Sequence, residues 1–76
     1  MNDIRKIAIG PDYKGGAMHY VVGQEILGGK YKIHHIRYDD NQDAFKIWIE
    51  SIYNKEVVLW KKFISMPVSV EYNINF

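Results

Sequence analysis

Tyr31-Lys32-Ile33-His34-His35-Ile36-Arg37-Tyr38 is the segment from which we predict the architecture of this chain. Its aromatic and β-branched residues favour a β-strand, in which alternate side chains point to opposite faces. Its first two apolar positions, Tyr31 and Ile33, are odd-numbered. The next two, Ile36 and Tyr38, are even-numbered, so strict alternation cannot place all four on one face. One extra residue at His34-His35 repairs the pattern, and a β-bulge is the usual device. We therefore predict a bulged strand over residues 30–38, bent so that a short sheet folds over onto itself.

The strand before this segment is expected over residues 17–27. Gly28-Gly29 would follow it as a two-residue hairpin turn, because glycine reaches positive φ without steric cost. This turn would pair Ile26 with Tyr31. Gly23 lies within the strand and predicts a bend, since glycines often mark the point where a sheet turns a corner.

The strand after this segment is expected over residues 44–50, beyond a polar loop formed by residues 40–43. A loop of this length pairs Ile36 with Ile47, so that the core-facing side chains of the two strands lie on the same face of the sheet. Alternation then directs one set of side chains inward and the other outward. The inward set is Phe45, Ile47 and Ile49, and the outward set is Lys46, Trp48 and Glu50.

Three further strands complete the predicted sheet, over residues 4–9, 56–62 and 68–76. A 3₁₀ turn is expected at residues 63–66, which are too few for a helix and precede Pro67. No segment shows a sustained apolar period of 3.6 residues. The chain is therefore predicted to be all-β, a meander of five to six short strands with one 3₁₀ turn before the last, in a single domain spanning residues 1–76.

This order of elements resembles an SH3-like barrel from about residue 17 to the end. The resemblance is one of layout, because the acidic loop and the paired aromatics of peptide-binding SH3 domains are absent from this sequence. It implies a small closed or nearly closed barrel. The OB-fold is the alternative, although it usually carries a helix between its third and fourth strands, for which no segment here is long enough.

Composition excludes several classes of protein. Ten Lys and Arg against nine Asp and Glu give a net charge of +1, which argues against a polyelectrolyte binder and against an acidic mimic of DNA. The absence of Cys excludes disulfides, thiolate metal sites and a cysteine nucleophile. No apolar run has the ~18 residues of a membrane helix, and the N-terminus lacks a signal-peptide stretch, so we expect a cytoplasmic domain.

No set of residues points to catalysis. The glycine-rich segment 10–16 lacks the Gly-Lys-Ser/Thr and the following helix of a phosphate-binding loop. His34 and His35 point to opposite faces of a regular strand; if a bulge tilts them together near His19, a metal still needs a carboxylate or water as a further ligand. No Ser has a base and an acid in recognisable spacing. We therefore expect no catalytic residue, no cofactor and no metal, and we predict that the chain is not an enzyme.

Trp48 is the residue that most indicates function, because alternation places it on the outside of the sheet. A hairpin pairing Glu50 with Glu56 sets Trp48 opposite Val58 and Lys46 opposite Trp60, although the like-charge pair counts against this register. The predicted binding residues are those of this face and of the nearby loop: Trp48, Val58 and Trp60, with Lys46 and Lys62 at the rim and Tyr13 and Lys14 on the glycine-rich segment.

Three interpretations of this face are open. It is a protein interface, since Trp is enriched at binding hot spots; or a stacking platform for single-stranded nucleic acid; or a second core, covered by the N-terminal strand or the glycine-rich segment. The small net charge favours protein over nucleic acid. A small ligand, held at the barrel mouth or between protomers, is a further alternative.

The last strand, residues 68–76, is a second candidate interface, because it contains no Lys or Pro to blunt an open edge. It would form a homodimer unless it pairs internally with the first strand.

Ile, Lys, Asn and Tyr, whose codons are rich in A and T, make up 30 of the 76 residues, a bias typical of a low-GC bacterium or its phage. We therefore expect a non-catalytic protein–protein interaction module, an accessory or inhibitor protein of a phage or mobile element.

Overall fold

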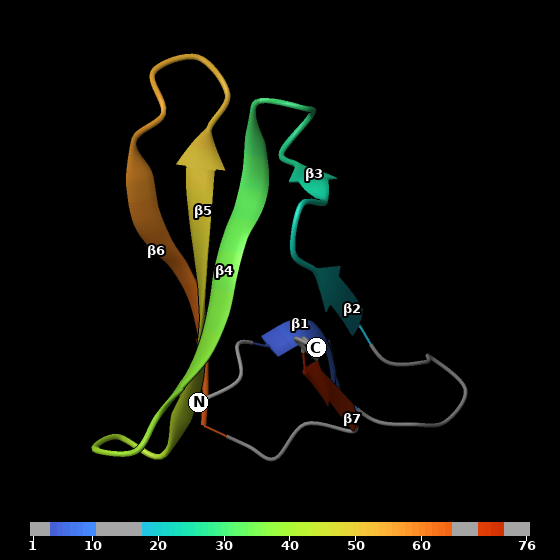
Figure 1. Cartoon of the computed structure of the whole chain (residues 1–76), viewed down its shortest axis with the longest axis vertical. Helices are drawn as coiled ribbons and strands as arrows, with labels where there is room; N and C mark the ends of the chain where they lie inside the picture. The colour runs from blue at the N-terminus through green and yellow to red at the C-terminus, as the bar shows by residue number, and fades with distance from the viewer. Residues whose placement is uncertain (1–3, 11–17, 65–68, 73–76) are drawn as a thin grey trace, which may run out of the picture.

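A computed structural model describes residues 4–10, 18–64 and 69–72, which form seven β-strands in one antiparallel sheet (Figure 1). These residues contain no helix, so the predicted all-β class is confirmed for them. It follows that none of the described segments is a helix long and apolar enough to cross a membrane. The strands are β1 (Ile4–Ile9), β2 (Met18–Val21), β3 (Glu25–Ile26), β4 (Tyr31–Asp39), β5 (Ala44–Ser51), β6 (Val57–Phe63) and β7 (Ser69–Tyr72).

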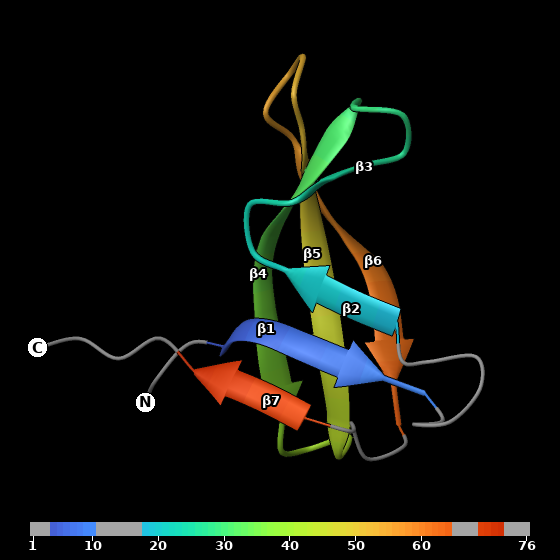
Figure 2. The same ribbon diagram turned by 90° about the vertical axis from the view of Figure 1, so that its right-hand side faces the viewer.

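The sheet is folded into two layers. Its hydrogen-bonded order is β2-β1-β4-β5-β6, with β3 alongside β4 and β7 alongside β1. Figure 2 shows β2, β1 and β7 lying across one side of the β4–β5–β6 layer. We call that side of the β4–β5–β6 layer the inner face. The other side, which no described strand crosses in either view, is the outer face (Figures 1 and 2).

β4 carries the bulge predicted from its sequence. Ile33 pairs with Ile49, but His35 pairs with Trp48, so His34 is the extra residue. Ile33 and Ile36, on either side of the bulge, are both buried, with exposures of 1% and 0%. The bulge therefore keeps apolar side chains of opposite parity on the same inner face.

The two hairpins that contain β4 have the predicted registers. Ile26 pairs with Tyr31 across the Gly28-Gly29 turn. Ile36 pairs with Ile47 across the loop of residues 40–43. Turn chemistry and loop length were sufficient to fix both pairings.

The strand predicted over residues 17–27 is interrupted at the expected bend. Gly23 has a φ of 94°, a value that glycine adopts without strain. Its backbone N–H donates to the carbonyl of Ile33 at 2.8 Å, so the chain leaves β1 at this point and joins β4. The predicted single strand is therefore two short ones, β2 and β3, whereas Ala17 lies outside the described residues.

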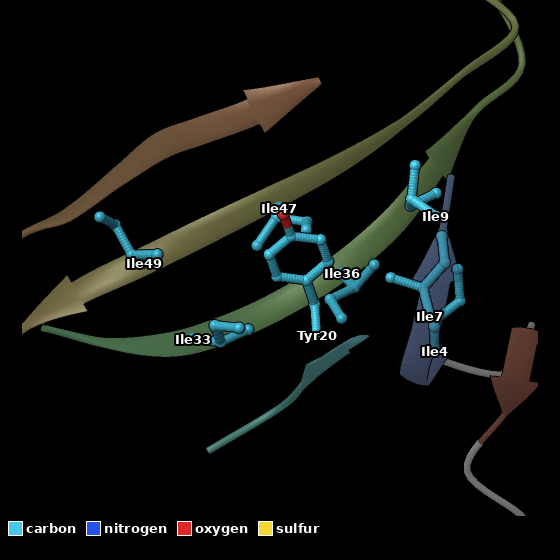
Figure 3. Packing of buried hydrophobic residues seen from close by; sticks show 8 residues of the cluster. All are labelled: Ile4, Ile7, Ile9, Tyr20, Ile33, Ile36, Ile47 and Ile49. Carbon is cyan, nitrogen blue, oxygen red and sulfur yellow. The ribbon is translucent and has the colours of Figure 1, made fainter. Parts of the chain in front are cut away.

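The core lies between the two layers and consists largely of isoleucine (Figure 3). Burying an isoleucine side chain contributes about 1.5–3 kcal/mol, so this cluster is the main source of stability in a chain that has no cysteine. The buried members are Ile4, Ile7, Ile9, Tyr20, Ile33, Ile36, Ile47 and Ile49.

The sheet is open rather than a closed barrel, because within the described residues β6 pairs only with β5 and β2 only with β1. Aromatic side chains pack across the seam between β2 and β6. Tyr20 on β2 meets Trp60 edge-on and Phe63 at a tilt, both with ring centroids 5.8 Å apart. Packing between rings thus holds together two edges that hydrogen bonds do not join.

The predicted 3₁₀ turn at residues 63–66 does not occur in its described part. Phe63 is the last residue of β6, and Ile64 follows it without helical structure. Phe63 packs against the core, which keeps the backbone extended to this point. Ser65 and Met66 lie outside the described residues.

β7 is the described part of the predicted last strand. It pairs with β1, Val70 opposite Ile7 and Ser69 opposite Ala8. Arg5 and Glu71 add an exposed ion pair at 2.8 Å. Internal pairing of the last strand with the first is therefore confirmed for residues 69–72, while residues 68 and 73–76 lie outside the described part and the homodimer stays a prediction.

Replacing Ile47 by Ala should lower the free energy of unfolding by about 2–5 kcal/mol, because the side chain is fully buried and its loss leaves a cavity. Ile64→Ala is the matched control: its side chain is 73% exposed, and the change should stay within about 0.5 kcal/mol. Urea denaturation of the two variants checks this. Equal losses would show that the core is not where this structure places it.

Candidate functional site

The turn between β5 and β6 determines which side chains of β6 face outward. Ser51 ends β5, and its Oγ accepts hydrogen bonds from the backbone N–H groups of Tyr53 and Asn54, at 3.2 and 3.3 Å. The backbone N–H of Ser51 donates to the carbonyl of Glu56 at 2.9 Å. These bonds leave five residues, 52–56, between the strands.

The predicted β5–β6 register is therefore wrong by one residue. Trp48 pairs with Leu59 rather than with Val58, and a slip of one residue moves the side chains of residues 57–59 to the other face. At Lys46 the difference is two residues, Lys62 in place of Trp60, so Lys62 stays on the outer face. Leu59 and Val57, which would face inward if Val58 faced outward as predicted, lie on the outer face with exposures of 49% and 40%. Val58 lies opposite Ile49 and faces the inner side.

The sequence contained one indication against the predicted register. That register required Glu50 to lie opposite Glu56, a like-charge pair that destabilises a hairpin. In the structure Glu50 lies opposite Val57 instead.

Trp60 is on the opposite face from the one predicted. It is the extra residue of a second β-bulge, between Leu59 and Lys61. Its ring packs against the core and meets Tyr20 at 84°, with the Lys61 Nζ 4.8 Å from its centroid. Trp48 and Trp60 therefore do not share one patch.

The outward side chains of β4, β5 and β6 form three cross-strand rows. Neighbouring rows are separated by two residues along β5, roughly 7 Å. The cationic row is Arg37, Lys46 and Lys62; the aromatic row is His35, Trp48 and Leu59; the mixed row is Lys32, Glu50 and Val57. Of the predicted site residues, Trp48, Lys46 and Lys62 thus lie together on the outer face.

The aromatic row presents ring edges outward. The His35 and Trp48 rings are stacked, with centroids 4.5 Å apart and an interplanar angle of 25°. This separation is close to the spacing between neighbouring strands, about 4.8 Å, so the rings stand side by side with their faces turned toward each other. The far face of the indole is turned toward β6, where Leu59 is its cross-strand neighbour. The row is a ridge of side-chain edges across three strands, in which Leu59 is exposed and Trp48 and the polar imidazole of His35 are half-buried.

The bulge on β4 also holds a histidine pair. The Nδ1 atoms of His34 and His35 are 2.6 Å apart and share a hydrogen bond, which requires one ring to donate through Nδ1–H and the other to accept. This bond and the stacking on Trp48 hold the His35 ring from two directions.

The cationic row places three positive side chains directly opposite one another, an arrangement that costs stability in a sheet. Only its middle member is neutralised: the Lys46 Nζ lies 2.8 Å from the Asp39 carboxylate. The hydrogen bond from Lys46 is the main reason why the pKa of Asp39 is below its ordinary value, with a further contribution from the Asn41 backbone N–H. Among the described residues, Arg37 and Lys62 have no ion pair.

The mixed row balances its own charge. The Lys32 Nζ lies 3.9 Å from a Glu50 carboxylate oxygen, and Val57 completes the row. Among the three rows, positive charge is therefore concentrated in the cationic row, at the end nearer the loop of residues 40–43, which itself carries Asp40 and Asp43.

The other predicted site residues do not add to this face. Tyr13 and Lys14 lie outside the described residues. His19 lies on β2, opposite Ala8, in the other layer from the His34–His35 pair. Within residues 4–10, 18–64 and 69–72, no group of three or more His, Asp or Glu side chains is placed to hold a metal ion.

Comparison of the chain with protein-family models, with curated proteins and with solved structures finds no match. The function must therefore be argued from the chain's own side chains.

The pKa of the Asp39 carboxyl should lie below 3.8, and Lys46→Gln should move it back up toward that value. A depressed pKa means that the Asp39–Lys46 contact stabilises the fold fully above the unfolded pKa and loses that effect as pH falls through the folded pKa. The stability difference between wild type and Lys46→Gln should therefore shrink below about pH 4. Carbon-13 NMR titration of Asp39 checks the first point and acid denaturation the second; an Asp39 pKa unchanged by the substitution would contradict the pairing.

Proposed function

We propose that this chain is a non-catalytic protein–protein interaction module that binds through the outer face of β4, β5 and β6. The observation that carries the proposal is the aromatic row: Trp48 stands between His35 and Leu59 on a sheet face that no described strand covers. Of the two apolar members, Leu59 is exposed and Trp48 is half-buried. Accessible apolar side chains rimmed by charge mark interaction surfaces, and Trp is enriched at binding hot spots.

The orientation of the rings favours a protein partner over single-stranded nucleic acid. A base stacks on the face of an aromatic ring, but one face of Trp48 is stacked on His35. The other is turned toward Leu59 on the neighbouring strand. A ridge of edges suits insertion between the side chains of another protein. Nucleic acid stays the alternative, because the cationic row offers partners for phosphates.

The architecture that presents this face is, in our proposal, an opened SH3-like barrel. Two successive hairpins, β3–β4 and β4–β5, lead on to β6, and the final strand β7 returns to pair with β1. This is the order expected of such a barrel, with the β2–β6 seam packed by aromatic rings instead of hydrogen bonds.

The biological setting that we propose follows from composition. The high content of Ile, Lys, Asn and Tyr supports an accessory or inhibitor protein of a phage or mobile element, acting in the cytoplasm. Pairing of a second copy along residues 68–76 would add a homodimer, since the described part of β7 pairs on one edge only, with β1. A small ligand is the further alternative.

Trp48→Ala should weaken binding of the partner by about 2 kcal/mol or more if the indole is a hot spot, which is roughly a thirtyfold rise in Kd. The partner is first captured from the host with the wild-type chain and then titrated against the variant by calorimetry. Tyr53→Ala is the control, because Tyr53 is 79% exposed and lies on the β5–β6 turn, outside the three cross-strand rows.

Equal affinities of the two variants would contradict the proposal, provided that urea denaturation shows both to be folded. If the captured partner is single-stranded nucleic acid, its affinity should fall steeply as salt rises, because bound cations are released from phosphates. That result would replace the proposed function by its alternative.

A further inference from the structure

We infer that the outer face recognises an acidic protein segment, one that sets carboxylates beside a large apolar side chain. This inference rests on the proposed function and specifies the chemistry of the partner. The cationic row would bind the carboxylates of the partner, and the aromatic row would bind its apolar side chain. The two rows lie side by side across the same three strands.

The cationic row supplies the first part of the argument. Arg37, Lys46 and Lys62 lie directly opposite one another, although like charges in such positions destabilise a sheet. Lys46 is engaged by Asp39 at 2.8 Å, but the described residues provide no carboxylate for Arg37 or Lys62. The row therefore lacks the compensating charge that a partner would bring.

Two nearby carboxylates, Asp43 and Glu50, are engaged elsewhere on the chain, and the third, Asp40, makes no ion pair with Arg37 or Lys62 among the described residues. The Tyr38 hydroxyl donates to Asp43, and this bond raises the pKa of Tyr38. Glu50 lies beside Lys32 in the mixed row. Charge complementarity thus calls for carboxylates from outside, at the end of the face nearer residues 40–43.

The spacing of the rows indicates how such a segment is built. The aromatic and cationic rows are two residues apart on β5, roughly 7 Å, which is also the distance between alternate side chains on a strand. An extended partner with a large apolar residue followed two positions later by Asp or Glu matches both rows at once. Its apolar side chain would contact the Trp48 and Leu59 edges while its carboxylate reaches Arg37 or Lys62.

A second copy of this chain fits the face poorly. The three rows and Asp39 together contain four cations, Lys32, Arg37, Lys46 and Lys62, against two carboxylates, Asp39 and Glu50. Where two such faces meet with their cationic rows together, the rows would repel each other. The face therefore favours an acidic partner over self-association.

The test uses synthetic capped peptides as probes of the isotope-labelled full chain. Leu-Thr-Asp-Thr-Asp should bind at millimolar concentration and shift the NMR signals of the Trp48 indole and the Arg37 and Lys62 side chains. Two control peptides should each bind at least tenfold more weakly. Leu-Thr-Lys-Thr-Lys has positive charges in place of the carboxylates, and Ala-Thr-Asp-Thr-Asp lacks the large apolar side chain. The double substitution Arg37→Glu, Lys62→Glu should reverse the preference toward the lysine peptide; both side chains are exposed, and urea denaturation verifies folding.

Equal binding of the acidic and basic peptides, or no shift with the acidic one, would overturn the inference. So would tighter binding of a thymidine hexanucleotide on the same residues. A captured partner that depends on Trp48 but is unaffected by the Arg37→Glu, Lys62→Glu substitution would leave the proposed function intact and refute only its acidic chemistry. A captured partner that binds the Trp48→Ala variant as tightly as the wild type would refute both the proposed function and the acidic chemistry.

Discussion

The extra residue at His34 is the constraint on which the rest of the structure depends. On the inner side it brings Ile33 and Ile36 into one core despite their opposite parity. On the outer side it moves His35 into register with Trp48, so that the two rings stack. The same irregularity therefore builds the core that stabilises the fold and positions the side chain that flanks the candidate binding residue.

A second bulge, at Trp60 on β6, lies on the other side of β5 from the bulge at His34. The β4 bulge lies between the pairs of Ile49 and Trp48, and the β6 bulge between the pairs of Trp48 and Ile47. Trp48 is thus flanked by a bulge on each neighbouring strand, and bulges increase local bending and twist. Both bulges thus lie where the aromatic row crosses the sheet, and Trp60 turns inward to pack against Tyr20.

Much of the fold could be predicted from the sequence because polar and glycine turns fix register on both sides of β4. The β5–β6 pairing could not, for a physical reason. Val57-Val58-Leu59-Trp60 is apolar at every position, so alternation gives no preference for either face, and an edge strand has no second neighbour to decide it. Hydrogen bonds from Tyr53 and Asn54 to Ser51 Oγ set the loop length instead. The outward positions of Trp48, Lys46 and Lys62 were predicted, and that of Arg37 follows from the same β4–β5 register; that of Leu59 could not be predicted.

The central claim is that the two indoles lie on opposite faces of the β4–β5–β6 layer. Nuclear Overhauser contacts measured from each indole test it most directly. This account predicts contacts of Trp60 with the Tyr20 ring, and of Trp48 with the His35 ring and the Leu59 methyl groups. Contacts of Trp60 with the Lys46 side chain, and of Trp48 with the Val58 methyl groups, would show the alternative register and contradict the outer face described above.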